Sequence, residues 1–282
     1  MNILIGADPE VFVKRHNKFV PACGMIKGTK EKPFPVKSGA VQVDGLALEY
    51  NINPASTLQE FIRNVITVKH ELRSLIPSEY NLSTVPVARN FLNFNTLPDE
   101  SKELGCEPDY NAYTPGMIPQ ALRSKPDENV RVGAGHIHIG WRDDNVDPLD
   151  PVHFEECKLV IKELDIVLGP ALALIEGRPG HERREHYGPL GSFRPKSYGV
   201  EYRTPSNIWT KNRAMMTLVY KTVMEVMKRI MDHRKGLCHE RVNRYDTIIA
   251  IDRAFKYGKD VDVKIICDRL INRARKFDYV SV

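Results

Sequence analysis

Val132-Gly-Ala-Gly-His136-Ile-His138-Ile-Gly140 is the stretch of this chain from which the fold is most directly predicted. Successive side chains of a β-strand point to opposite faces, so His136 and His138 share one face while Ile137 and Ile139 point to the other. The isoleucines predict an apolar, packed side, and the histidines predict a polar pocket on the opposite side. Paired imidazoles can bind a metal ion, contact an anion or form a purely structural pair.

Three further stretches repeat this pattern of two polar side chains, two residues apart, in apolar surroundings. They are Asp8-Pro9-Glu10, Glu49-Tyr50-Asn51 and Glu201-Tyr202-Arg203, and Asp44 precedes Glu49 by five residues. Buried carboxylates are costly unless cations or metals compensate their charge. Four such strands side by side therefore predict one pocket lined by carboxylates, imidazoles and a guanidinium. Solvent-facing strands also alternate in this way, but Lys, Thr and Ser are missing from these positions, which favours the pocket.

The bulk composition is that of a globular protein and argues little for nucleic-acid binding. With 282 residues and 42% hydrophobic content, the chain can bury a sizeable core, and we expect a single domain over 1–282 whose part from about 210 to 282 is helical. The formal charge of +5 comes from 41 basic residues scattered among 36 acids, which suits a nucleotide better than a nucleic acid. Five widely spaced cysteines indicate neither a disulfide framework nor a zinc ribbon. Since no signal peptide or membrane span is recognisable, we expect a cytoplasmic protein without a membrane partner.

Apolar periodicity predicts the elements that carry these motifs. Residues 40 to 51 are expected to form one strand, in which a bulge at Gly45 brings Asp44 and Glu49 to the same face. Ser56-Thr57-Leu58-Gln59 has the form of a capping box and begins a helix predicted over 57–76. A second long helix is predicted over 152–175, with a distortion at Gly169-Pro170.

The segment from Gly177 to Gly199 is predicted to be a loop that grips phosphate. It contains several glycines and prolines together with four arginines: Arg178, Arg183, Arg184 and Arg194. Guanidinium groups match the oxygens of a phosphate, and glycine lets backbone amides approach it. The chain has no GxxxxGK[ST] motif and no GxGxxG that opens a helix, so P-loop and Rossmann folds are not indicated.

Taken in chain order, the four motifs resemble those of the carboxylate-amine ligases of the glutamine synthetase superfamily, which includes the glutamate-cysteine ligases. The motifs are Asp8-x-Glu10, Asp44 with Glu49, Gly-Ala-Gly-His136-x-His138 and Glu201-x-Arg203. Segments that begin at Gly6, Gly105 and Tyr198 look closer still to the amidoligases encoded by tailed phages, which would place the protein in the host cytoplasm. The resemblance spans residues 3 to about 210. The chain departs from it at Asp8, where Glu is more usual, and at His138, where glutamine synthetases have Asn.

The resemblance implies an α+β fold: a mainly antiparallel sheet whose concave face binds ATP and two or three Mg²⁺ ions, with Mn²⁺ as a substitute, and helices packed outside. Two sets of metal ligands are implied, namely Glu10, Asp44 and Glu49 for one ion and Asp8, His136 and Glu201 for the other. The resemblance implies that Arg203 holds the transferring phosphate, and we expect Arg194 of the arginine-bearing segment to be catalytic as well. The expected nucleotide contacts are Arg194, Arg203, His138 and Asn51.

The predicted enzyme is an ATP-dependent, ADP-forming ligase. ATP phosphorylates the carboxylate, and the amine displaces phosphate from the acyl phosphate; such transfer needs mainly positioning and charge neutralisation. The expected partners are carboxylate and amine substrates, either small molecules or peptides, whose identities the sequence leaves open together with the oligomeric state. Asp109 is the candidate base for the amine. Two alternatives are a metal-dependent hydrolase and a nucleotide-binding phage protein without turnover. Arg203 can also pair with Glu201 as a purely structural ion pair.

Overall fold

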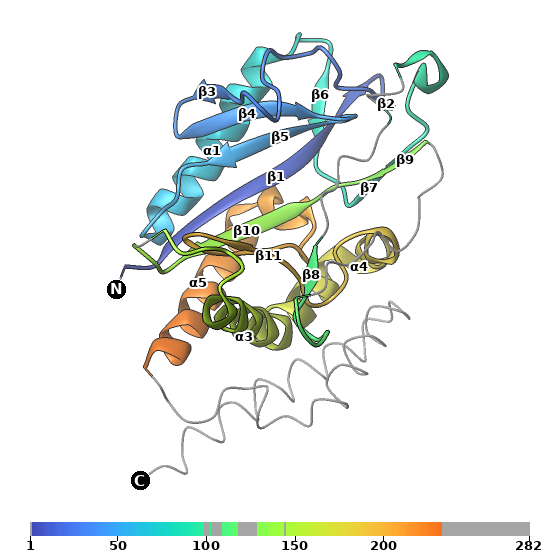
Figure 1. The fold of residues 1–282 in the computed structure, drawn as a ribbon. Coiled ribbons are helices and arrows are strands. Elements are labelled where there is room, and N and C mark those ends of the chain that lie inside the picture. Colours follow the sequence, from blue (N-terminus) through green and yellow to red (C-terminus); the bar gives the residue numbers. More distant parts are fainter. Residues whose placement is uncertain (1, 99–101, 103–108, 118–128, 144, 233–282) are drawn as a thin grey trace.

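The computed structural model describes residues 2–98, 102, 109–117, 129–143 and 145–232, and Figure 1 shows how their elements are arranged. Every strand pairing among them is antiparallel, and helices pack against the sheet, so the predicted α+β class is confirmed. The expected helical C-terminal part is described only as far as residue 232. Much of the segment that begins at Gly105, which carries part of the resemblance, also lies outside the described residues. No helix in the described part of the chain is long and apolar enough to cross a membrane.

The main sheet has ten strands within the described residues, eight of them in the order β3-β4-β5-β1-β10-β12-β11-β8, with β2 and β6 beside the far end of β1. Their bounds are β1 Leu4–Arg15, β2 Lys18–Val20, β3 Phe34–Val36, β4 Gly39–Asp44, β5 Ala47–Ile52, β6 Asn81–Ser83, β8 Tyr110–Asn111, β10 Gly135–Gly140, β11 Ser192–Lys196 and β12 Gly199–Tyr202. A two-stranded sheet joins β7 Val87–Arg89 to β9 Val130–Val132.

Helices from both halves of the described chain build the other layer. They are α1 Leu58–Leu75, α3 Pro151–Val167, α4 Gly169–His186 and α5 Arg213–Met231, with short 3-10 turns η1 Phe94–Thr96 and η2 Asn207–Lys211. Side chains of α1, α3 and α5 share one apolar core with the strands, and α5 packs against both α1 and α3. These helices therefore cover a single face of the main sheet and leave the opposite face for polar side chains.

The alternation predicted for the strands is confirmed. On β1, Ile5 and Val11 are fully buried in the core with the helices, whereas Asp8 and Glu10 project from the other face. On β10, Ile137 and Ile139 are fully buried in the same core. Because β1 pairs directly with β10, and β10 with β12, the polar residues of all three strands gather on one surface.

Close packing of backbone explains the glycines ahead of the histidines. A Cβ atom on Gly135 would lie 2.3 Å from the carbonyl oxygen of Ser206, and one on Gly133 would lie 2.6 Å from that of Val85. Real atoms do not approach so closely, so both positions require glycine. Neighbouring backbone, together with the side chains of Asn207 and Trp209, fills the space beside these two glycines.

The expected single strand over 40–51 is wrong, because the chain reverses there. It forms a hairpin of β4 and β5, and Gly45, with a φ of 55°, lies in the turn between them. Gln42 pairs with Glu49 across the hairpin, and Asp44 lies two residues further along β4. Paired residues of an antiparallel ladder point to the same side, so Asp44 and Glu49 share a face through the hairpin instead of a bulge.

The predicted helix over 57–76 is present as α1, but its cap differs from the expected one. Thr57 is the N-cap and its side chain accepts a hydrogen bond from the Glu60 backbone N–H at 3.2 Å, while the Glu60 carboxylate accepts from the backbone N–H of Ser56 at 3.0 Å. The capping residues are therefore Thr57 and Glu60, and Gln59 takes no part in the cap. The distortion expected at Gly169-Pro170 is the boundary between α3 and α4.

The predicted phosphate loop over 177–199 is wrong for most of its length. The chain kinks at Gly177, where φ is 57°, and helix α4 then continues to His186. Pro179 lies in the first turn after the kink, a position that helices tolerate because no backbone donor is lost there. Strand β11 occupies 192–196, so only a short turn separates the helix from the sheet.

Candidate functional site

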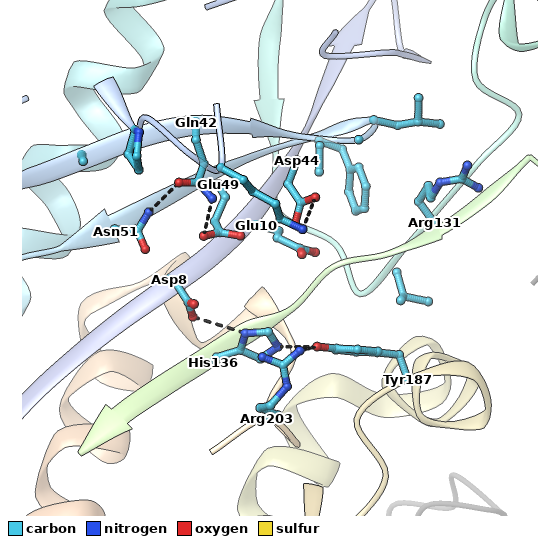
Figure 2. A pocket seen from close by; sticks show the side chains of 18 of the residues that line it. Asp8, Glu10, Gln42, Asp44, Glu49, Asn51, Arg131, His136, Tyr187 and Arg203 are labelled. Atoms are coloured by element: carbon cyan, nitrogen blue, oxygen red, sulfur yellow. Dashed lines mark hydrogen bonds and ion pairs between the residues drawn. The ribbon is translucent and has the colours of Figure 1, made fainter. Parts of the chain in front are cut away.

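A cavity of about 630 Å³ lies on the face of the sheet opposite the helices. Figure 2 shows the side chains that project into it from β1, β4, β5 and β10. Its lining includes His136 and charged groups of both signs: Asp8, Glu10, Asp44, Glu49, Lys30, Arg131, Arg194, Lys196 and Arg203. Acids gather toward β4 and β5, while Arg194 and Lys196 come from β11 and Arg203 follows β12, so the cavity has an anionic and a cationic side.

On the anionic side, Glu10, Asp44 and Glu49 offer carboxylate oxygens within 4.8 Å of one another. Glu10 and Glu49 are direct partners across β1 and β5. Burial, followed by repulsion from Asp44, raises the pKa of Glu10 to about 7. Burial and the nearby carboxylates also raise the pKa of Glu49 well above its usual value. Both shifts mean that the protein does not fully compensate the charge of this group.

Within the described residues, one ammonium group and two hydrogen-bond donors contact these carboxylates. Lys30 Nζ lies 3.0 Å from Asp44 Oδ1. Glu10 Oε2 accepts a hydrogen bond from the backbone N–H of Ala134 at 2.8 Å, and Gln42 donates to Glu49 Oε1 at 3.1 Å. Three carboxylates thus share one ammonium group among these contacts. Hard oxygen ligands with uncompensated charge fit a divalent cation such as Mg²⁺ or Mn²⁺.

A second group joins Asp8, His136 and Glu201, whose ligand atoms also lie within 4.8 Å of one another. His136 Nδ1 is 3.3 Å from Asp8 Oδ1 and 3.2 Å from Glu201 Oε1. Burial lowers the pKa of His136, with the charge of Arg203 acting in the same direction. A neutral imidazole between two carboxylates is also a possible cation site.

Cations of the protein surround Glu201 in this second group. Arg203 Nη1 donates to Glu201 Oε1, Lys196 Nζ lies 3.1 Å from Oε2, and Arg194 Nη1 lies 3.8 Å from the same oxygen. Arg203 therefore forms the ion pair with Glu201 that the structural alternative requires. The charge of the second group is compensated from within, unlike that of the first, so a metal ion there would compete with basic side chains.

The other two nitrogens of Arg203 have partners of their own. Nη2 donates to the hydroxyl of Tyr187, and Nε lies 2.7 Å from Asp109 Oδ1. Asp109 also lies 3.6 Å from Arg194 Nη2. Its carboxylate is thus engaged by two guanidinium groups, and its role as the base for the amine stays a prediction.

The remaining predicted contacts lie at the edges of these groups. Asn51 lines the cavity, and its amide donates to Gln42 Oε1 at 3.3 Å. His138 Nε2 lies 3.1 Å from Asp8 Oδ2, and its Nδ1 lies 2.5 Å from the hydroxyl of Tyr198. The metal ligands, catalytic arginines and nucleotide contacts predicted from the sequence thus all lie in or beside the cavity, whereas Arg178, Arg183 and Arg184 of the predicted phosphate loop do not line it.

Sequence reasoning missed three residues of the site. Lys196 is two residues after Arg194, and Gln42 is two residues before Asp44, so the same alternation that identified their neighbours applies to them. Tyr187 lies in the segment that was predicted to be a loop, and no periodic pattern marks it. Its contact with Arg203 depends on the course of α4, which the glycines and prolines of that segment concealed.

Two buried groups hold the backbone behind the cationic side. Arg183 is fully buried, and its guanidinium donates to the carbonyl oxygens of Thr204 at 2.8 Å and Arg203 at 3.3 Å. Burial lowers the pKa of Arg183 to about 10. The expectation that Arg183 contacts phosphate is therefore wrong, because its guanidinium donates hydrogen bonds to backbone carbonyl oxygens instead. The Asp165 carboxylate accepts from the Tyr202 hydroxyl at 2.7 Å and from the Gly191 amide at 2.6 Å.

Asp165 predicts a pH dependence of stability. Burial raises its pKa from 3.8 to about 7, so the folded state retains a proton that the unfolded state has lost, and stability falls as pH rises from about 4 to about 7. At about 1.4 kcal/mol per pH unit, this group costs up to about 3 kcal/mol between pH 5 and 7. Asp165→Asn should remove that part of the decline. Urea unfolding of parent and variant at both pH values measures it, and parallel declines would contradict it.

Comparison with known proteins places part of the chain in a described family. The family model for phage phiEco32-like COOH.NH2 ligase-type 2 matches residues 117–281. Among solved structures, a crystal structure described as a novel glutamine synthase homolog is 10% identical in sequence and has a TM-score of 0.40, with 99% of this chain and 68% of that chain covered. A likeness at that level supports no conclusion about the chain. A search of curated proteins gave no match.

Proposed function

Because the chain belongs to the family of phage phiEco32-like COOH.NH2 ligases of type 2, whose model matches more than half of it, we propose that it joins a carboxylate to an amine with ATP and releases ADP. Membership gives the reaction class, carboxylate-amine ligation. The use of ATP and an acyl-phosphate intermediate are the proposed part. One observation carries them: uncompensated carboxylates and a cluster of guanidinium and ammonium groups face each other across one cavity.

Phosphoryl transfer to a carboxylate explains why both signs of charge are present. The donor and the acceptor are anions, so they approach each other only when cations neutralise them. Carboxylates of the protein cannot do this directly, but they can hold divalent cations that do. Arginine and lysine on the opposite wall can contact the same oxygens from the other side. A cavity with both walls is suited to this reaction more than to hydrolysis by one metal-bound water.

In the proposed site, Glu10, Asp44 and Glu49 hold one Mg²⁺ ion, which neutralises phosphate charge when bound. Their uncompensated charge supports binding of this ion even without nucleotide. Asp8, His136 and Glu201 hold a second ion more weakly, because Arg203 and Lys196 already contact Glu201. Nucleotide phosphates would offer those two basic groups an alternative partner and so release Glu201. Mn²⁺ suits the same ligands.

Arg203 and Arg194 contact the transferring phosphate in this proposal, with Lys196 beside them. Arg203 lies two residues after Glu201, so both side chains reach the cavity side of the sheet. Asp109 orients both arginines. His138 and Asn51 border the cavity near Asp8 and Glu49 and are the proposed further contacts of the nucleotide. The substrates are an acid and an amine, either small molecules or peptides.

The proposal is tested by the release of ADP from ATP and Mg²⁺ in the presence of pooled carboxylic acids and amines. ADP release should depend on both pools, and mass spectrometry should find an amide whose amount equals that of the ADP. With hydroxylamine as the amine, a hydroxamate of the acid should form, because hydroxylamine traps an acyl phosphate.

Other outcomes identify the alternatives. A hydrolase would release phosphate, or cleave an amide, without any added amine and without forming an amide. Tight nucleotide binding with no product under any condition would indicate a binding protein without turnover. Either result contradicts the proposed ligase.

A further inference from the structure

Tyr187 lies between His136 and Arg203 on the cationic side of the cavity. It follows α4 directly, is 8% exposed and lines the cavity. Its hydroxyl oxygen is 3.2 Å from His136 Nε2 and accepts a hydrogen bond from Arg203 Nη2, as Figure 2 shows. The guanidinium carbons of Arg183 and Arg203 each lie 5.3 Å from the centre of its ring. The ring is therefore held by two arginines, and one hydroxyl group serves both Arg203 and His136.

The position of the proton on His136 determines what this hydroxyl group does. His136 Nδ1 faces the oxygens of Asp8 at 3.3 Å and Glu201 at 3.2 Å, which are acceptors, so Nδ1 carries the proton. Arginine can only donate, so the Tyr187 oxygen accepts from Arg203. The hydroxyl hydrogen is then available for Nε2 of His136, which has a lone pair in this tautomer.

A cation held by Asp8, His136 and Glu201 requires the opposite arrangement. Nδ1 must then present its lone pair, so the ring proton belongs on Nε2. A histidine that binds a metal usually donates its other N–H to a fixed partner, and the Tyr187 oxygen is in place for that hydrogen bond. The oxygen then accepts from both His136 and Arg203, and its hydrogen turns toward another acceptor. Since Tyr187 lines the cavity, an anionic ligand oxygen can be that acceptor.

We propose that Tyr187 is a positioning residue that couples His136 to Arg203. When a cation is bound, its hydroxyl oxygen accepts from Nε2–H and so stabilises the His136 tautomer that binds the cation, and the same oxygen fixes the orientation of the Arg203 guanidinium toward the cavity. A change in the tautomer of His136 is thereby transmitted to the Arg203 guanidinium through the hydroxyl oxygen of Tyr187. This inference rests on the proposed function, because it gives Arg203 a phosphate and His136 a cation.

Tyr187→Phe tests the proposal, because it retains the ring beside both arginines and removes only the hydroxyl. Turnover should fall about 10-fold to 100-fold, the range found when a partner of a metal-binding histidine is lost, while KM for ATP changes less than about threefold. Independently of turnover, titration with Mn²⁺ in the presence of a non-hydrolysable ATP analogue should show the weaker ion bound about 10-fold to 100-fold less tightly. The ion held by Glu10, Asp44 and Glu49 should keep its affinity.

A spectrum of the parent protein provides a measurement that needs no variant. With ¹⁵N-labelled histidine, the His136 signals should report a proton on Nδ1 without metal and on Nε2 when Mg²⁺ and the nucleotide analogue are present. Tyr220→Phe is the matched control. Tyr220 packs against Phe61 on the helical side, with 5.5 Å between ring centres, and its loss of a hydroxyl should leave metal affinity and turnover unchanged.

Three results would overturn the proposal. One is a Tyr187→Phe variant with the turnover and Mn²⁺ affinities of the parent; another is a fall in turnover without any change in the affinity of the weaker ion. The third is a parent protein whose His136 proton stays on Nδ1 in the presence of Mg²⁺ and the analogue. If the parent protein forms no amide, the proposed ligase activity is contradicted instead. The Mn²⁺ titration and the ¹⁵N spectrum do not depend on turnover, so they still test the role of Tyr187 in that case.

Discussion

Glu10→Gln is expected to abolish ATP turnover and, at the same time, to make the metal-free protein more stable. Glu10 lies with Asp44 and Glu49 in a group of carboxylates that mainly Lys30 compensates. Replacing one carboxylate with a neutral amide of the same shape removes repulsion in the metal-free state and removes a ligand in the metal-bound state. A residue that only supported the fold would show the opposite effect on stability.

The raised pKa of Glu10 sets the size of the gain in stability. Its pKa rises from 4.5 to about 7 on folding, so stability falls as pH rises through that interval, and the loss is complete at pH 8. Glutamine has no such loss, and the free energy of unfolding at pH 8 should increase by up to about 3 kcal/mol. Turnover should fall at least about 100-fold, because the transferring phosphate loses a bound cation worth several kcal/mol.

Urea unfolding at pH 8, with and without Mg²⁺, measures both effects. Mg²⁺ should stabilise the parent protein and should have little effect on Glu10→Gln. Glu225→Gln is a suitable control, since Glu225 pairs with Arg229 on the surface of α5. It should change neither turnover nor the response to Mg²⁺. Turnover at the parent rate, or a full response to Mg²⁺ in Glu10→Gln, would contradict the metal assignment.

Arg203→Lys should lower turnover by about 100-fold or more while changing nucleotide affinity only modestly. The guanidinium reaches Glu201, Tyr187 and Asp109 through three different nitrogen atoms. Lysine keeps the charge but has one nitrogen, so it cannot keep these partners and also meet two phosphate oxygens. Since charge builds up on the transferred group, the loss should affect turnover more than ground-state binding.

Single-turnover kinetics and nucleotide titration separate these two quantities. Arg142→Lys provides the control, because Arg142 forms a comparable ion pair with Glu156 at 2.8 Å and does not line the cavity. It should retain the parent rate. A loss of stability in Arg203→Lys with normal turnover would mean that the ion pair with Glu201 is structural, and the phosphate role of Arg203 would be wrong.

The sequence predicted the faces of the strands better than their connections. Alternation along β1 and β10 depends only on the geometry of a strand, so the separation of Asp8 and His136 from the core could be predicted locally. The turn at Gly45 was mistaken for a bulge, because glycine with positive φ serves both. The prediction that Asp44 and Glu49 share a face is nevertheless confirmed, because a hairpin and a bulge both place these two side chains on the same side of the sheet.

The rest of the site depends on contacts that no local pattern encodes. Helix α4 continues beyond Gly177 because Arg183 and Arg184 are buried and paired within the fold, which overrides the unfavourable composition of the segment. Tyr187 reaches Arg203 only as a result of that continuation. Which basic side chains compensate Glu201 is likewise set by the pairing of β11 with β12.

Alternate side chains of β1 belong to two separate environments, the core and the cavity. Residues that face the helices pack in the core, and residues that face the cavity are those that would contact ions and substrates in the proposed ligase. Substitutions at Asp8 or Glu10 can therefore leave the packing of Ile5 and Val11 undisturbed, and changes in the core can leave the lining of the cavity as it is.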